Sequence, residues 1–160
     1  MAIPPGSSLS AVVPDASVLV SIVAKEAYSY PVTVAQMRQY AQDGWLVYAP
    51  GVIVSEALFA LCRKLQNSIL TAAQHARAVQ RLARATAGVL PPPMGEAALI
   101  ERAEQIRGSY GCSRSADSLY IALAEQLAQT RQTEFVTLDM AIPAWAASAA
   151  PTVTVRLLTP

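Results

Sequence analysis

The sequence has few of the side chains that build zinc or disulfide sites, and it has no long apolar run. Only two cysteines, Cys62 and Cys112, and a single histidine, His75, occur in 160 residues. A structural zinc site usually needs four Cys or His ligands, so zinc is excluded, and unpaired cysteines are expected to be reduced thiols of a cytoplasmic protein. No stretch reaches the roughly 18 apolar residues of a membrane span, and the N-terminus lacks a basic, apolar leader. We therefore expect no membrane segment and no signal peptide.

Charged residues are also scarce. Asp, Glu, Lys and Arg make up 14% of the chain, the net charge is +1, and 53% of the residues are hydrophobic. This composition indicates a compact globular protein and excludes a disordered one. It gives no overall attraction to nucleic acid, although a local basic patch stays possible. The length suits one domain over residues 1–160, with residues 1–10 as a loose N-terminal arm.

Short apolar segments alternate with helical segments along the chain. Strands are expected at 11–14, 45–50, 88–93, 133–139 and 152–158. Helices are expected at 17–26, 32–44, 51–66, 71–87, 95–108, 113–130 and 141–149, with Asp15 and Ser115 as caps of the first and sixth. Strands that alternate with helices, without hairpin turns between them, indicate a mainly parallel sheet that is covered on both faces.

Four of the eleven acidic residues occur where a carboxylate is costly. Asp15 and Asp139 each end an apolar strand segment, Glu56 interrupts the apolar face of its helix, and Asp117 opens the most apolar helix. Each has an ordinary explanation when taken alone. Asp15 and Asp139 suit caps, Asp117 suits the first turn of a helix, and Glu56 could pair with an arginine.

Taken together, the four positions indicate a shared site. Asp15 and Asp139 lie at carboxyl ends of strands, which is where parallel α/β sheets bind ligands. Glu56 and Asp117 follow on helices that could lean over the same edge. Carboxylates that meet in one cleft repel one another and raise their pKa values, and a divalent cation relieves that repulsion. Oxygen ligands without Cys or His favour Mg²⁺ or Mn²⁺.

The segments PDASVLV, VIVSEALFAL, SADSLYIALAEQL and FVTLD, in this order, resemble the PIN-domain family, and in particular its small VapC-type toxins. The resemblance extends from about Val12 to Leu157. It implies a three-layer α/β/α sandwich with a central, mainly parallel sheet of four or five strands. It also implies a metal-dependent ribonuclease that leaves a 5′-phosphate and a 3′-hydroxyl. The SADSLY approach to the third acid and a YSYP insert depart from the usual family pattern and leave the substrate preference open.

The same resemblance assigns residues to the site. The acidic cluster would be Asp15, Glu56, Asp117 and Asp139, and Ser17 and Thr137 match hydroxyl positions beside it. We expect Asp15 and Asp117 to be the principal metal ligands, directly or through water. Glu56 would orient the attacking water or accept its proton, and Asp139 would complete the ring or hold a second metal. Ser17 and Thr137 would support the ligands by hydrogen bonds.

RNA must still approach an acidic cleft. Three arginines share one face of a predicted helix and could contact phosphates or form a solvated face: Arg77, Arg81 and Arg84. Three tyrosines could stack on bases or pack inside the protein: Tyr28, Tyr30 and Tyr48. The apolar surplus suggests a homodimer, or a groove that receives an antitoxin.

Two other classes of protein are alternatives to a ribonuclease. A receiver-like signalling module would need a lysine after a late strand, but the only lysines, Lys25 and Lys64, both lie on early helices. A PIN-like scaffold that binds RNA or a partner without cutting stays open, although the presence of all four acids argues against it.

Overall fold

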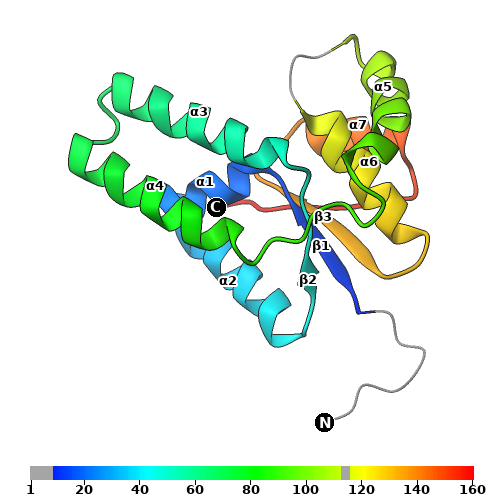
Figure 1. Cartoon of the computed structure of the whole chain (residues 1–160), viewed down its shortest axis with the longest axis horizontal. Helices are drawn as coiled ribbons and strands as arrows, with labels where there is room; N and C mark the ends of the chain where they lie inside the picture. The colour runs from blue at the N-terminus through cyan, green and yellow to red at the C-terminus, as the bar shows by residue number, and fades with distance from the viewer. Residues whose placement is uncertain (1–8, 113–115) are drawn as a thin grey trace.

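A parallel four-stranded sheet forms the centre of the protein (Figure 1). The computed structural model describes residues 9–112 and 116–160. The strands are β1 (Ala11–Pro14), β2 (Leu46–Val47), β3 (Thr133–Thr137) and β4 (Thr154–Leu157). They lie in the order β2-β1-β3-β4, and all three pairings are parallel. The sheet therefore puts β1 and β3, the two strands that are followed closely by Asp15 and Asp139, side by side.

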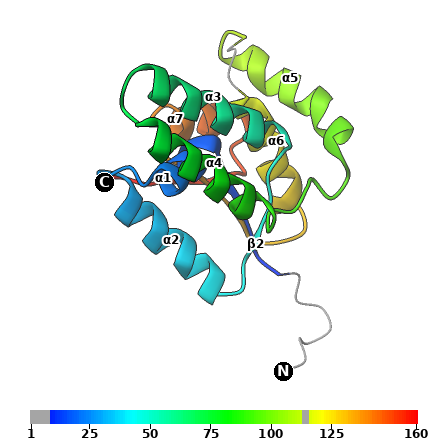
Figure 2. The same cartoon turned by 60° about the vertical axis from the view of Figure 1, so that its left-hand side comes forward.

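Helices cover both faces of the sheet, which makes the predicted α/β/α sandwich. The helices are α1 (Ala16–Ala24), α2 (Tyr30–Gln42), α3 (Val52–Gln66), α4 (Ala72–Thr86), α5 (Ile100–Ser109), α6 (Asp117–Ala128) and α7 (Ile142–Ala149). Helices α1 to α4 lie on one side and α5 to α7 on the other (Figure 1). Helices α3 and α4 run side by side as a hairpin that packs on α1 (Figure 2).

Alternation along the strands explains how both faces of the sheet are buried. Val12 and Val136 pack in a small cluster with Tyr40 of α2, whereas Val13 and Phe135 belong to the main core. Successive side chains of a strand point to opposite faces. Strand β1 and the centre of β3 are apolar because both faces of the sheet are covered there.

The prediction of a strand at 88–93 is wrong. Only one isolated bridge forms there, between Leu90 and Tyr48, so the sheet has four strands and not five. The three prolines that follow, Pro91 to Pro93, have no backbone N–H to donate to a neighbouring strand. The bridge still places the segment before α5 beside the end of β2.

Other boundaries differ from expectation by a turn or less. The expected strand at 45–50 contracts to β2, and the helix expected at 95–108 begins with the 3₁₀ turn Glu96–Leu99 before α5. The expected cap at Ser115, and residues 1–8 of the expected arm, lie outside the described residues. No helix in the described ranges is both long and apolar enough to cross a membrane.

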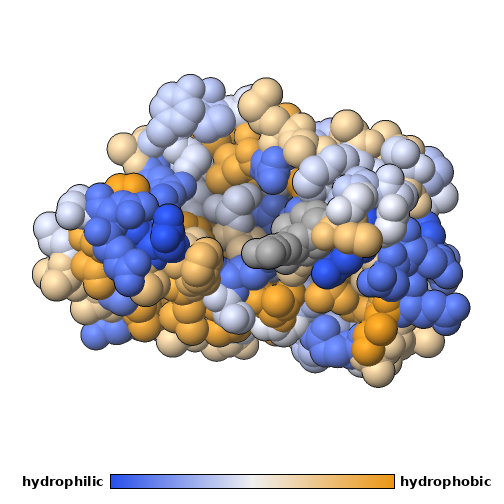
Figure 3. Space-filling view, turned by 90° about the horizontal axis from the view of Figure 1, so that it is seen from above, coloured by the Kyte–Doolittle hydropathy of each residue, from blue (hydrophilic) through white to orange (hydrophobic). Residues whose placement is uncertain are grey.

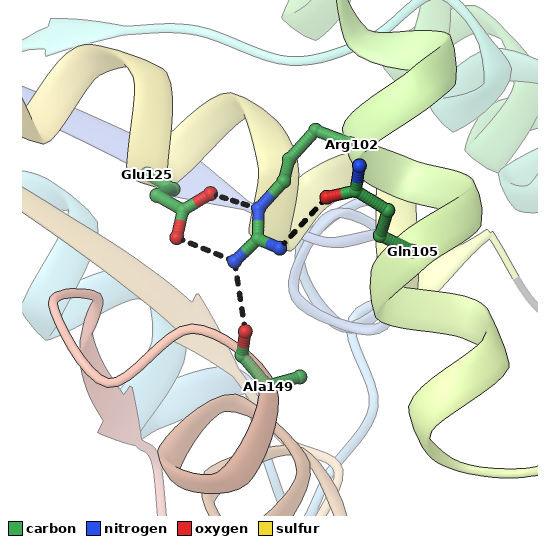
Figure 4. A network of polar contacts seen from close by, with 4 residues as sticks. All are labelled: Arg102, Gln105, Glu125 and Ala149. Carbon is green, nitrogen blue, oxygen red and sulfur yellow. Dashed lines mark hydrogen bonds and ion pairs between the residues drawn. The ribbon is translucent and has the colours of Figure 1, made fainter.

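One arginine connects the three helices on the α5 side (Figure 4). Arg102 of α5 donates from Nη2 to Glu125 Oε1 of α6 and to the carbonyl oxygen of Ala149 in α7, both at 2.8 Å. Its Nη1 also donates to Gln105 Oε1 at 3.2 Å. Paired Arg–carboxylate hydrogen bonds fix direction as well as distance. The network therefore holds α6, which begins at Asp117, in a fixed position relative to its neighbours.

Candidate functional site

All four predicted acids line one pocket, which we call the acid pocket. It has a volume of about 450 Å³ and is lined by Asp15, Ala16, Ser17, Ser55, Glu56, Phe59, Asp117 and Asp139. The acids come from four separate parts of the chain, namely the starts of α1 and α6, the second turn of α3, and the loop after β3. Seen from above, the surface is hollowed between the α3–α4 side and the α5 side (Figure 3).

Asp15 is the most deeply buried of the four carboxylates, with 4% of the residue exposed. It is the N-cap of α1, because the backbone N–H of Val18 donates to its Oδ1 at 3.2 Å. The capping interpretation is therefore correct. However, a cap needs one oxygen, whereas Asp15 also accepts hydrogen bonds from Ser17 Oγ on Oδ1 and from Thr137 Oγ1 on Oδ2, both at 2.5 Å. Capping alone does not account for this burial and this set of donors.

Ser17 and Thr137 connect Asp15 to the turn after β3. Each hydroxyl donates its proton to Asp15 and accepts a backbone N–H in return. Leu138 N donates to Ser17 Oγ at 3.1 Å, and Asp139 N donates to Thr137 Oγ1 at 2.9 Å. The two hydroxyls therefore fix the Asp15 carboxylate relative to the backbone that carries Asp139. The family resemblance assigned both residues to the support of a metal ligand, and that role stays a prediction.

Burial changes the acidity of Asp15. Removal of the carboxylate from water raises the pKa of Asp15 from 3.8 to about 6, against the hydrogen bonds from Ser17, Thr137 and Val18, which lower it. The negative charge of Asp117 adds a smaller increase. The sequence argument expected mutual repulsion to raise the pKa values, and for Asp15 burial contributes more than repulsion does.

Glu56 is held by α6. Its Oε2 accepts a hydrogen bond from Tyr120 Oη at 2.6 Å, and its Oε1 accepts one from Ala116 N at 3.3 Å. The Tyr120 side chain is fully buried, and burial together with Glu56 raises the pKa of Tyr120, so the phenol stays protonated and can donate. Within the described residues the partner of Glu56 is thus a tyrosine, whereas the sequence analysis considered an arginine.

Tyr120 is the residue that the sequence analysis did not assign to the site. It lies three positions after Asp117 on α6, and residues three apart share one helix face. A polar aromatic residue on the same face as a site acid was the available signal. In the sequence, however, it is surrounded by apolar residues and looks like part of the core.

Asp117 is half-buried, as Glu56 is, and Asp139 is the exposed acid of the four. Asp117 occupies the first turn of α6, where the helix dipole stabilises negative charge. The Oδ1 atom of Asp139 accepts a hydrogen bond from Ala141 N at 2.8 Å in the turn that leads to α7. Both ordinary explanations therefore hold locally. Neither excludes a second role, since both side chains also line the acid pocket.

The carboxylates stand apart within the pocket. Across residues 9–112 and 116–160, no three His, Cys, Asp or Glu side chains are close enough to hold a metal ion together. The donor set itself consists of carboxylate and hydroxyl oxygens, which fits a hard cation such as Mg²⁺ or Mn²⁺ and not zinc. A cation in this pocket would need bridging waters or rotation of the acidic side chains.

Sequence comparison identifies the family of this chain. The sequence model of the PIN domain matches residues 12–144, so the chain belongs to the PIN domain family. No curated protein matches the chain in sequence.

Solved structures agree on the fold. The chain resembles a chain of VapBC2 from Rickettsia felis bound to a DNA fragment from its promoter, with a TM-score of 0.62, 8% identity, and coverage of 93% of this chain and 99% of that one. It resembles FitAB bound to an IR36 DNA fragment, with a TM-score of 0.57, 14% identity, and coverage of 91% and 94%. PAE2754 from Pyrobaculum aerophilum gives a TM-score of 0.54 and 16% identity, with coverage of 95% and 88%. At these identities the likeness establishes the fold alone.

Proposed function

We propose that this protein is a Mg²⁺- or Mn²⁺-dependent endoribonuclease and that the acid pocket is its active site. The observation that carries the proposal is that Asp15, Glu56, Asp117 and Asp139 line one pocket although they come from four separate segments. A fold that needed these acids only as caps or surface charges would have no reason to direct all four to the same hollow. Membership of the PIN domain family supports the same function.

The proposed metal ligands are Asp15 and Asp117, directly or through water. A bound divalent cation lowers the pKa of water and neutralises charge that develops on the phosphoryl group. Ser17 and Thr137 orient the Asp15 carboxylate, and Tyr120 and the N–H of Ala116 orient that of Glu56.

The remaining steps fall to the chain's own carboxylates. Glu56 is held in place and can align the attacking water and take its proton, and Asp139 completes the acidic ring at the open side of the pocket. The products would be a 5′-phosphate and a 3′-hydroxyl.

Two arginines of α4 are available for the RNA backbone. Arg77 and Arg84 are exposed, whereas Arg81 is half-buried and donates from Nε to the carbonyl oxygen of Val23 at 2.6 Å. The arginine stripe expected from the sequence is therefore divided. Arg81 fastens α4 to the end of α1, and we propose Arg77 and Arg84 as phosphate contacts outside the pocket.

We further propose a cytoplasmic toxin that forms a homodimer and is controlled by an antitoxin protein. Structural neighbours include VapBC2 and FitAB, both of them solved as complexes with DNA. Exposed apolar side chains on α3, namely Val54, Leu58 and Phe59, give a second copy or an antitoxin an apolar surface to cover.

A scaffold that binds RNA without cutting it is the alternative. The two functions differ in the effect of metal. The ribonuclease should shorten a labelled RNA in Mn²⁺ and leave it intact in EDTA. The scaffold should retain the RNA at full length in both buffers while still shifting it in a binding gel.

Replacement of Tyr120 by phenylalanine should lower kcat for RNA cleavage about tenfold, because Glu56 loses the hydroxyl that orients it toward the attacking water. The matched control is Tyr40→Phe. Tyr40 is also a buried tyrosine whose hydroxyl donates to a glutamate, Glu134, but it lies away from the acid pocket. Both variants should lose about 1–2 kcal/mol of stability. Initial rates of RNA cleavage in Mn²⁺ should separate them, since Tyr40→Phe should keep the wild-type rate, and equal rates for Tyr120→Phe and wild type would refute the positioning role.

A further inference from the structure

A second pocket adjoins the acid pocket. We call it the Tyr28 pocket. It has a volume of about 540 Å³, and two of its lining residues, Ala16 and Ser17, also line the acid pocket. The two hollows therefore share a wall at the start of α1. A polynucleotide whose phosphate lay over the four acids would have a neighbouring nucleotide within reach of this second hollow.

The walls of the Tyr28 pocket suit a flat ring. Val20, Ala60 and Leu138 contribute apolar surface, and Tyr28 lies in the turn between α1 and α2 with 80% of its surface exposed. An exposed tyrosine beside an apolar hollow offers a stacking face, and stacking on a base does not depend on the base's identity because every base has a π-face. Small-ligand sites have this character, with mostly apolar walls and a few fixed polar groups.

The polar groups of the pocket are also held in place. Glu26 accepts a hydrogen bond from Ser29 Oγ at 3.0 Å and pairs with Lys64 Nζ at 2.5 Å. Ser29 in turn shares a hydrogen bond with the fully buried hydroxyl of Ser21, at 2.6 Å. These contacts fix the Glu26 carboxylate at the edge of the pocket, where its side chain keeps 28% exposure.

The Glu26 carboxylate limits the kind of ligand group that the Tyr28 pocket can bind. An ionised glutamate only accepts hydrogen bonds, so Glu26 can accept from further N–H donors even though Lys64 balances its charge. A nucleobase carries such N–H donors and a phosphodiester does not, so the pocket suits a base. Adenine, cytosine and guanine each carry an exocyclic amino group that can donate to Glu26. The N–H donor on the pairing edge of uracil is its ring N3–H, which lies between two carbonyl oxygens that a carboxylate repels.

We propose that the Tyr28 pocket binds the nucleobase next to the scissile phosphate, with Tyr28 stacking on the base and Glu26 accepting from its amino group. This proposal rests on the proposed ribonuclease function for its place in the reaction. It makes the pocket a determinant of sequence preference, with uracil disfavoured at that position.

The test compares Tyr28→Ala and Tyr28→Phe with wild type on short single-stranded RNAs in Mn²⁺. Tyr28→Ala should lower kcat/KM about tenfold, and Tyr28→Phe should retain wild-type values because the ring remains. Since Tyr28 is exposed, neither change should disturb the fold. An RNA with an abasic nucleotide at the flanking position should be cut equally by all three proteins. Equal cleavage of the intact RNA by Tyr28→Ala and wild type would overturn the proposal.

A second measurement separates this proposal from the proposed function. Adenosine, cytidine, guanosine and uridine are titrated against metal-free full-length protein, and chemical shifts near Ala60 and Tyr28 are followed by NMR. The first three should perturb these signals more than uridine does, and Tyr28→Ala should abolish the effect. If wild type cuts no RNA but these shifts appear, the ribonuclease proposal fails and the base pocket stands. If no nucleoside perturbs them, or if Tyr28→Ala affects only dimer or partner binding, the base pocket is refuted.

Discussion

The variant Asp117→Asn should cleave RNA in Mn²⁺ at least about 100-fold more slowly than wild type. Asp117 lines the acid pocket at the start of α6 and is close enough to Asp15 to raise its pKa. Asparagine keeps the size of the side chain but removes the charge that would attract a cation, and loss of one group that stabilises transition-state charge commonly costs this much. Initial rates on a labelled RNA measure the effect.

Two controls separate loss of the site from loss of the fold. Glu104→Gln makes the same kind of charge change at an exposed position of α5 outside the pocket, and it should leave the rate unchanged. In metal-free buffer Asp117→Asn should melt no lower than wild type, because one repelling charge near Asp15 is gone. A clear drop in melting temperature with retained cleavage would show that Asp117 serves the helix and not the site.

The stability of wild type relative to Asp15→Asn should fall as pH rises, by up to about 3 kcal/mol between pH 4 and pH 7.5. The pKa of Asp15 is raised from 3.8 in the unfolded chain to about 6 in the folded protein. Below pH 3.8 both states hold the proton and the contribution is full. Between pH 3.8 and about pH 6 only the folded state keeps the proton on Asp15, so the contribution of this proton to the free energy of unfolding declines as pH rises. Above about pH 6 that contribution is lost.

Urea unfolding of both proteins in EDTA across this pH range measures the difference. The comparison matters because other carboxylates titrate too, and they are common to both proteins. At pH 7.5, Mn²⁺ at about 100 times its Kd should raise the free energy of unfolding of wild type by about 2.7 kcal/mol. The increase for Asp15→Asn should be much smaller. A stability difference that stays constant with pH would show that the folded protein does not raise the pKa of Asp15.

The sheet and its crossovers could largely be predicted from the sequence. AVVP is uninterruptedly apolar and TEFVT has an apolar centre, Phe135 and Val136, as strands that are buried on both faces do, and the helices between them have clear ends. The segment GVLPPP looked similar because Val89 and Leu90 are apolar. Its prolines prevent pairing beyond one bridge, and local composition does not show whether a neighbouring strand will offer a partner.

The candidate site could be predicted as a set of residues but not as a set of contacts. The position of Asp15 and Asp139 after neighbouring parallel strands predicted that they would meet at one edge. The pairing of Ser17 and Thr137 with the two oxygens of Asp15 depends on the register of β1 with β3. The hydrogen bond from Tyr120 to Glu56 depends on how α6 packs against α3, and pattern along one chain does not encode that packing.

The ordinary explanations also proved compatible with a site. Asp15 does cap α1, and Asp139 does accept a hydrogen bond from the turn before α7. A cap fixes a carboxylate at the end of a strand, and this is also what a metal ligand at a sheet edge requires. A capping role and a role as metal ligand are therefore compatible for these residues.

The most direct test of the account is cleavage of a labelled single-stranded RNA by wild type and by Asp15→Asn, each in Mg²⁺, in Mn²⁺ and in EDTA. The account predicts that wild type cuts in at least one metal, leaves a 5′-phosphate, and is inactive in EDTA, and that Asp15→Asn is inactive in all three buffers. Cleavage by wild type that persists in EDTA, or cleavage by Asp15→Asn at the wild-type rate, would contradict a metal-dependent ribonuclease built on the acid pocket.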